Sequence, residues 1–149
     1  MGIIVKFAGR SIWEPTLKAG FCFVAQVRSL EALLDTESGV GLIIADEVDI
    51  NLAAFENFLT KCIEKLERTN DGEIFALVMG CLQICIALNW KMGGKLSQVS
   101  TKLQPLLEEA GVVQKMNWRI TSLQPAEEEI DGRTGEVRDM RDWVVYRKK

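Results

Sequence analysis

Carboxylate side chains are concentrated at two points of the 149-residue chain. Closely spaced carboxylates can serve acid–base catalysis, bind a metal ion or recognise a basic surface. Neither group has the alternating Asp-x-Asp-x-Asp-Gly pattern of a calcium loop, and nothing in the sequence places two of the acids in one cleft. We therefore expect partner-binding loops, although both groups are also compatible with plain solvated loops. The residues are Asp46, Glu47 and Asp49 in the first group and Glu127, Glu128, Glu129 and Asp131 in the second.

Histidine is absent from the chain. Its absence removes Ser-His-Asp and Cys-His nucleophile systems, histidine general bases and most catalytic zinc sites. We expect a protein that is not an enzyme and that holds no cofactor and no metal. Catalysis by carboxylates or lysine stays open as a third alternative.

The four cysteines lie in apolar runs, at Cys22, Cys62, Cys81 and Cys85. Cys81 and Cys85 share one helical face, but no histidine and no second cysteine pair completes a zinc site. Buried free thiols indicate a reducing compartment. Because residues 1–6 lead into a strand-like run and not into a secretory signal, the sequence predicts a cytoplasmic protein.

Composition favours a folded, acidic, water-soluble chain: 48% of the residues are hydrophobic, and the net charge is −3 with a pI near 5.1. A nucleic-acid partner is not expected, because such binding needs a basic face. Trp143 and Tyr146 beside the basic C-terminus could stack on single strands, but Asp139 and Asp142 intrude and a solvated terminal strand is the favoured interpretation.

The uncharged segment at residues 74–90 decides the architecture, since every face of a helix built from it is apolar. At about 1.5 Å per residue it falls a little short of a bilayer core, and Gln83 lies at its midpoint. An amphipathic helix precedes it, with apolar residues at 3–4 spacing over residues 52–66. We expect a buried core helix and no membrane; a membrane span and an interface helix are the alternatives.

The remaining elements are predicted from periodicity and turn residues. We expect a strand at residues 3–8, a loop at 9–20, a strand at 21–27, a helix at 29–35 capped by Ser29, and a turn followed by a buried strand at 39–45. A helix starts at Asp49 or Asn51, and another, kinked or split at Pro105, covers 96–110 and ends at Gly111. Strands at 116–121 and 142–147 form a C-terminal hairpin.

These elements predict an α+β fold: a central buried helix wrapped by amphipathic helices, with N-terminal strands and a C-terminal β-hairpin. One domain is expected over residues 1–149, with a helical core at about 49–111 and a β segment at about 112–149.

Two stretches resemble the small immunity proteins of bacterial toxin systems: MGIIVKF at residues 1–7 and GVGLIIADEVDINLAAFENFL at residues 39–59. The resemblance covers about a third of the chain, and such proteins share no catalytic motif and no single fold. It implies a cytoplasmic, non-enzymatic inhibitor that binds one cognate toxin, here a basic-surfaced protein domain, and blocks it by occlusion. The alternative is a self-assembling structural or accessory protein, possibly viral. A monomer or a small homo-oligomer is expected.

Overall fold

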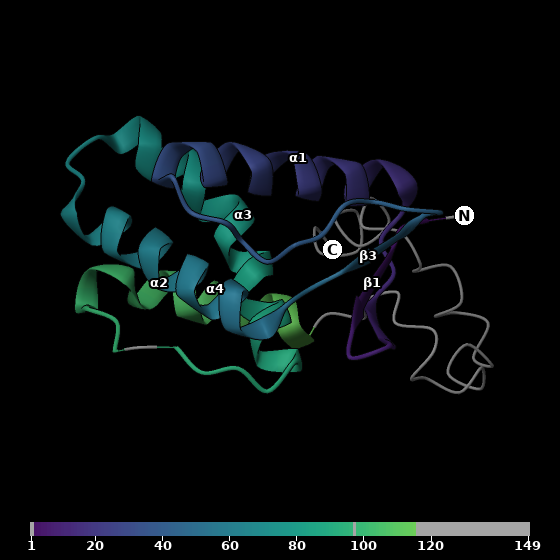
Figure 1. Cartoon of the computed structure of the whole chain (residues 1–149). Coiled ribbons are helices and arrows are strands. Elements are labelled where there is room, and N and C mark those ends of the chain that lie inside the picture. Colours follow the sequence, from purple (N-terminus) through teal and green to yellow (C-terminus); the bar gives the residue numbers. More distant parts are fainter. Residues whose placement is uncertain (1, 97, 116–149) are drawn as a thin grey trace, which may run out of the picture.

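A computed structural model describes residues 2–96 and 98–115 of the chain, and the fold is α+β, as predicted. Four α-helices form most of the body, and a small three-stranded sheet lies at one end of it (Figure 1). The elements are β1 (Ile4–Phe7), β2 (Arg10–Trp13), α1 (Leu17–Leu34), β3 (Glu47–Asp49), α2 (Leu52–Arg68), α3 (Gly72–Lys91), the 3-10 turn η1 (Thr101–Leu103) and α4 (Gln104–Lys115).

The sheet has the strand order β2-β1-β3. β1 and β2 are antiparallel, with Phe7 opposite Arg10, and the two residues between them have positive φ angles, as tight hairpins require. β1 and β3 are parallel, with Lys6 opposite Asp49. The strand predicted at residues 3–8 is confirmed, but the loop predicted at 9–20 is wrong, because it contains β2 and the start of α1.

α1 replaces two elements that the sequence pattern had suggested. Residues 21–27 are not a strand, and Ser29 caps no helix, because one continuous helix runs from Leu17 to Leu34. Thr16 caps it by accepting a hydrogen bond from the Ala19 amide at 3.3 Å, and Asp35 ends it in the left-handed conformation. A short apolar run does not distinguish a strand from a helix by its hydrophobicity alone. The buried residues of α1 do have helical spacing: Gly20, Phe23, Val24, Val27 and Leu30.

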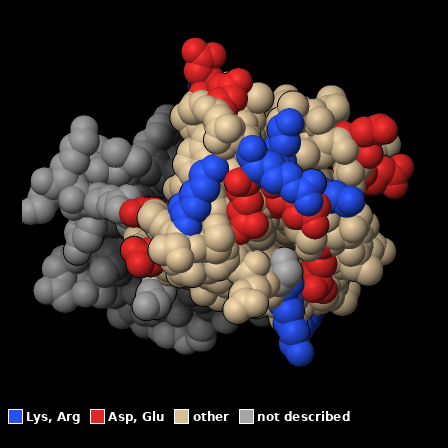
Figure 2. Space-filling view, turned by 90° about the vertical axis from the view of Figure 1, so that its left-hand side faces the viewer, with Lys and Arg blue, Asp and Glu red and all other residues tan. Residues whose placement is uncertain are grey.

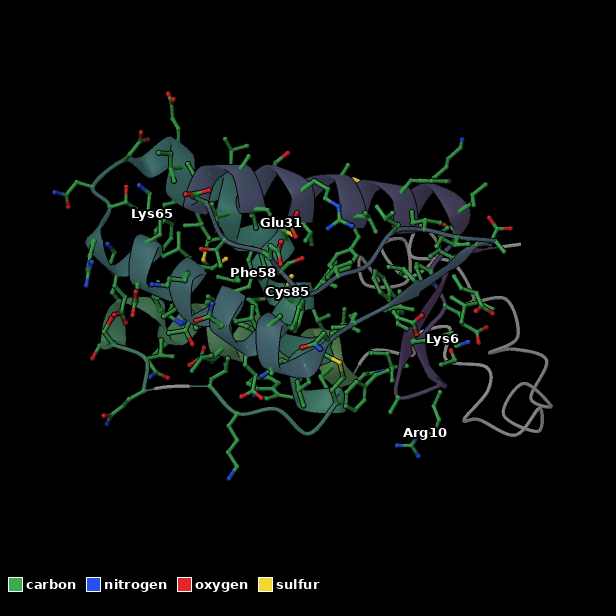
Figure 3. The ribbon with its side chains drawn as sticks, in the orientation of Figure 1. Lys6, Arg10, Glu31, Phe58, Lys65 and Cys85 are labelled. Carbon is green, nitrogen blue, oxygen red and sulfur yellow. The ribbon has the colours of Figure 1, made fainter. Side chains whose placement is uncertain are left out.

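α2 matches its prediction. The Asn51 side chain accepts from the Ala54 amide at 3.0 Å, which caps the helix. Its inner face packs into the core, and Figure 3 labels one of these side chains, Phe58. The buried residues of α2 are Phe55, Phe58, Leu59, Cys62, Ile63 and Leu66.

α3 is the predicted central helix, and it is buried along only part of its length. It packs mainly on α4 and α2 and also touches α1 and β2. From Cys81 to Asn89 most side chains are buried, whereas Leu77, one turn from the start, is 79% exposed. Among the described residues, α3 is the helix whose length and composition would allow a membrane span, and 44% of its most apolar window is buried by protein. Its second half is thus the wrapped core helix that was predicted, whereas its first half is buried on one side, at Val78, and exposed on the other, at Leu77.

The end of the described chain departs from its prediction. The helix predicted at 96–110 is wrong at both ends: α4 begins at Gln104, after the 3-10 turn, and continues through Gly111 to Lys115. Pro105 neither kinks nor splits it, because it lies in the first turn, where a missing amide hydrogen costs little. The predicted β segment from residue 112 is therefore wrong as far as Lys115. The predicted hairpin of residues 116–121 and 142–147 lies outside the described residues.

Candidate protein-binding hairpin

Residues 40–50 fold back on themselves as a β-hairpin, which contains β3 and which we call the 40–50 hairpin. The Gly41 amide donates to the Asp49 carbonyl at 2.8 Å. Ile44 and Glu47 exchange backbone hydrogen bonds of 2.8 and 3.0 Å around the tip. The tip is a two-residue turn in which Ala45 and Asp46 have φ angles of 50° and 62°, the geometry of a type I′ turn.

The tip presents bulky apolar side chains to solvent. Leu42 is 74% exposed and Ile44 is 70% exposed, whereas Val40, Val48 and Ile50 are buried. Isolated exposed apolar residues are common on protein surfaces. Here, two such residues lie within three positions and form a small apolar surface. They adjoin a turn whose positive φ angles disfavour alanine, and backbone strain of this kind is common at binding sites.

The first acidic group lies on the same hairpin, in the turn and on the strand opposite Leu42 and Ile44. Asp46 and Asp49 are exposed, and Glu47 forms an ion pair of 2.9 Å with Lys6 of β1. The hydrogen bond from Lys6 to Glu47 raises the pKa of Lys6, so the Lys6 ammonium group stays protonated at neutral pH. Figure 3 shows Lys6 at the sheet end of the molecule. Glu47 is thus partly neutralised, and Asp46 and Asp49 carry the outward negative charge.

Arg28 of α1 fixes the base of the hairpin. Its guanidinium donates to the Val40 carbonyl at 2.8 Å and to the Gly41 carbonyl at 2.6 Å. The same group forms an ion pair of 3.1 Å with Glu31, one turn further along α1. The planar guanidinium suits this arrangement, because its separate N–H groups can each meet a different acceptor.

Glu31 extends the contact to the segment that precedes the hairpin. Its carboxylate accepts from the Ser38 amide at 2.9 Å and from the Ser38 hydroxyl at 2.5 Å, and Ser38 in turn accepts from the Val40 amide at 3.0 Å. Burial alone would raise the pKa of Glu31, but the hydrogen bonds from Ser38 and Arg28 outweigh it and lower the pKa below its usual value. The carboxylate is therefore ionised at neutral pH and holds its partners.

Gly39 fixes the hairpin on its other side. It has a φ of 78°, and a Cβ atom there would lie 2.7 Å from the Asn51 carbonyl oxygen and 2.8 Å from the Ala54 Cβ. The Asn51 amide donates to the Gly39 carbonyl at 2.9 Å. The hairpin is thus held between α1 and the start of α2, while its tip projects into solvent.

The structure brings Asp46, Glu47 and Asp49 together on one hairpin, as a partner-binding loop requires. The second predicted group, Glu127–Glu129 with Asp131, lies outside the described residues. Leu42 and Ile44 were missed, because the apolar run at 39–45 had suggested a buried strand and that interpretation is wrong for its exposed part. One signal existed in the second half of the hairpin: Val48 and Ile50 alternate with Glu47 and Asp49, the pattern of a half-buried strand.

Nucleophilic and metal chemistry has little support among the described residues. No group of three His, Cys, Asp or Glu side chains there could hold a metal ion. Burial raises the pKa of Cys62 to about 12, and the contact with Cys81, whose Sγ lies 3.9 Å away, raises the pKa of Cys85 further than burial alone would. These thiols stay protonated near neutral pH and are weak nucleophiles. Burial lowers the pKa of Lys91, on α3, to about 8.

Comparison with known proteins matches the chain to a protein family. The profile of a family described as "Family of unknown function (DUF6086)" matches residues 1–118, a span that includes the 40–50 hairpin and every described helix and strand. The second acidic group lies beyond the matched residues. No curated protein and no solved structure matches the chain.

Proposed function

The chain belongs to this family of unknown function, DUF6086, and we propose that it is a cytoplasmic, non-enzymatic protein-binding protein of the immunity type. It neutralises one cognate toxin by occlusion. The 40–50 hairpin enters or covers the functional surface of the toxin and blocks its active site or its assembly. The partner is a protein domain with a basic surface beside an apolar pocket.

The observation that carries this proposal is the composition of the hairpin tip. Leu42 and Ile44 supply apolar area that is exposed in the free protein, and burial of apolar area drives most protein association. Asp46 and Asp49 add charges that speed encounter with a basic surface and reject an acidic one. Apolar anchors within a charged rim are typical of the centres of protein–protein interfaces.

Preorganisation also supports binding at this position. Arg28, Ser38 and Gly39 fix the hairpin base in the free protein, so little conformational freedom remains to be lost when a partner binds. A fixed, projecting hairpin suits occlusion, because the inhibitor must fill the site on the toxin without a change in its own conformation.

Affinity capture tests the proposal. The wild-type chain and the double variant Leu42→Ser/Ile44→Ser are immobilised and exposed to lysate of the source organism. The expected result is a basic protein that the wild type retains, that the double variant loses, and whose toxic activity the wild type suppresses in a purified assay. Val112→Ser is the control, because Val112 is also an exposed apolar residue but lies on α4, away from the hairpin.

Two outcomes would contradict the proposal. One is a set of captured proteins that is the same for the wild type and for the Leu42→Ser/Ile44→Ser variant. The other is full toxin activity in the presence of the wild-type chain. Added salt provides a further check, because a steered encounter with a basic partner slows as ionic strength rises.

A second candidate function is self-assembly as a structural or accessory protein. The exposed apolar side chains of α1 and α3, Leu17, Phe21, Leu33 and Leu77, favour it. Light scattering separates the candidates, since large assemblies that grow with concentration indicate self-assembly and a small discrete species favours the inhibitor.

A further inference from the structure

The outward side of α1 is almost without charge. A helix side that faces only water usually carries charged residues along its length. Arg28 and Glu31 are partly exposed and pair with each other, and Lys18, near the first turn, is the single charged residue among the more exposed positions of the helix. These positions, which we call the α1 face, are Leu17, Lys18, Phe21, Cys22, Ala25, Gln26, Ser29, Ala32 and Leu33.

α2 shows the contrast within the same molecule. Its exposed positions include Lys61, Glu64 and Arg68, and Lys65 beside them is half-buried. Figure 2, which looks onto the end of the molecule at the left of Figure 1, shows basic and acidic side chains intermingled over this region. One helix of the protein thus has an ordinary solvated side, and α1 does not.

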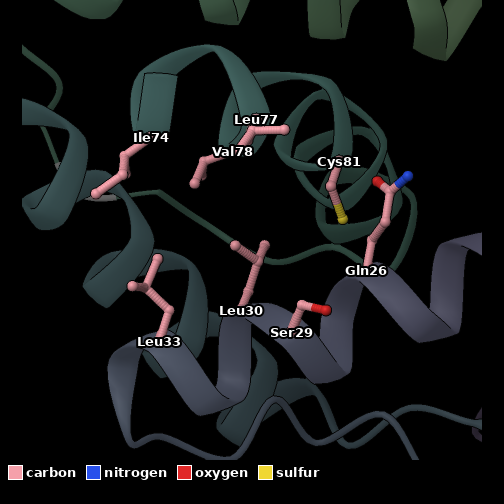
Figure 4. Close-up of a pocket in the computed structure, with 8 residues that line it drawn as sticks. All are labelled: Gln26, Ser29, Leu30, Leu33, Ile74, Leu77, Val78 and Cys81. Carbon is pink, nitrogen blue, oxygen red and sulfur yellow. The ribbon is translucent and has the colours of Figure 1, made fainter. Parts of the chain in front are cut away.

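The apolar surface continues from α1 onto the first half of α3. A groove of about 420 Å³ lies between the two helices, lined on one side by Gln26, Ser29, Leu30 and Leu33 and on the other by Ile74, Leu77, Val78 and Cys81. Figure 4 shows the two sets of side chains facing each other across it. Leu33 is 45% exposed at its rim and Leu77 is 79% exposed.

We propose that the α1 face, together with Leu77, is the interface with a second copy of this chain, in which the two α1 helices pack antiparallel. The charges around the helix favour this occupant. Lys18 lies near the start of α1, whereas Asp35 and Glu37 are exposed just after its end. An antiparallel pair brings each Lys18 close to the acids of the other copy, and a parallel pair would place the two Lys18 side chains together.

The dimensions of α1 agree with this pairing. With the two-fold axis at the midpoint of the helix, between residues 25 and 26, Lys18 is level with residue 33 of the second copy. Asp35 of the second copy is two residues further, or about 3 Å along the axis at 1.5 Å per residue, within reach of a lysine side chain. Each end of the interface then carries one Lys–Asp pair.

The size of the side chains also fits. Ala25 and Ser29, near the middle of the face, are small and allow two helices to approach to about 8 Å. Leu17 is level with residue 34 of the second copy, next to its Leu33, so large apolar side chains meet at both ends.

The two copies are related by a two-fold axis, so the assembly is complete as a dimer and does not extend into a filament. It uses none of the residues at the hairpin tip, so this proposal and the inhibitor proposal can fail separately.

Cysteine crosslinking tests the geometry. In a Cys22→Ser background, Ala25→Cys places two thiols beside the two-fold axis, and we expect mild oxidation to give a covalent dimer. Ala32→Cys is the matched control, because residue 32 is level with residue 19 of the second copy and its two thiols would be about 20 Å apart. Equal crosslinking of the two variants, or none at residue 25, would overturn the antiparallel pairing.

Sedimentation equilibrium tests the interface itself. The wild type is expected to be a dimer, Leu33→Glu a monomer with unchanged helical content, and Lys18→Glu a dimer with a dissociation constant about tenfold higher at low salt. Lys61→Glu, on the charged side of α2, should leave the constant unchanged. A monomeric wild type at micromolar concentrations, larger assemblies, or a dimer insensitive to Leu33→Glu would contradict the proposal.

Discussion

Arg28 is the side chain through which α1 holds the hairpin, and its two carbonyl partners belong to consecutive residues, Val40 and Gly41. A partly buried carbonyl group that has no hydrogen-bond donor destabilises the fold. A lysine cannot replace this arrangement fully, because its single ammonium group lacks the spread of the guanidinium. The exposed tip therefore depends on a residue that lies on another element.

Replacement of Arg28 by methionine tests this dependence. We expect a loss of about 1–3 kcal/mol in the free energy of unfolding, because two charged hydrogen bonds disappear. We also expect faster hydrogen exchange at the amides of Gly41, Ile44 and Glu47, which hold the hairpin together. Arg68→Met, on the exposed side of α2, is the control. Unchanged exchange in the hairpin of Arg28→Met would show that Arg28 does not hold it.

Glu31 gives a pH-dependent test of the same contact. Its pKa is lowered in the folded protein from the reference value of 4.5, so its ionised form stabilises the fold above that pH. This contribution is lost as the pH falls through the lowered pKa. Urea unfolding should therefore show Glu31→Gln less stable than the wild type at pH 7, with the difference shrinking below pH 4.5. A constant difference from pH 7 to pH 3 would contradict this role.

At the scale of elements, the hairpin and α1 show where the sequence pattern misled. Residues 42–45 are apolar and suggested a buried strand, because hydrophobicity does not record that the segment lies at the edge of the sheet and projects from it. The turn was also hidden, since Ala45 is a residue type that rarely adopts a positive φ. The acidic group of the hairpin could be predicted, because its residues are neighbours in the sequence and directly follow an apolar run.

The strain at the turn predicts a substitution that stabilises the protein. Ala45→Gly should raise the free energy of unfolding by about 0.5–1 kcal/mol, because glycine adopts positive φ without the Cβ clash. The same change at Ala53, exposed in the right-handed helix α2, should lower it by about 1 kcal/mol. Thermal or urea denaturation measures both. Destabilisation by both substitutions would show that the turn is not strained at Ala45.

At the scale of the whole molecule, α3 organises the core. Its second half packs on α2 and α4, and Leu82, Cys85, Ile86 and Leu88 are fully buried. The all-round apolar character of this helix predicted its central place. It did not predict that the first half has an exposed side, because burial depends on where α1 crosses, and α1 itself was misread as a strand followed by a short helix.

Two leucines of α3 test the division between its halves. Leu88→Ala should cost about 2–5 kcal/mol in the free energy of unfolding, because it leaves a cavity in the packed core. Leu77→Ala should change it by less than about 0.5 kcal/mol, because Leu77 is largely solvated. Denaturation should be followed at low protein concentration, where self-association contributes least. Similar losses for both variants would mean that Leu77 is also enclosed by protein.

The central claim is that the tip of the 40–50 hairpin contacts a partner protein, and site-specific photocrosslinking in the source cells tests it most directly. A benzophenone side chain replaces Leu42 in one variant and Lys61, on the charged side of α2, in a second. The account predicts that position 42 crosslinks to one basic protein and that position 61 does not. Absence of any adduct at position 42, or the same adducts at both positions, would contradict it.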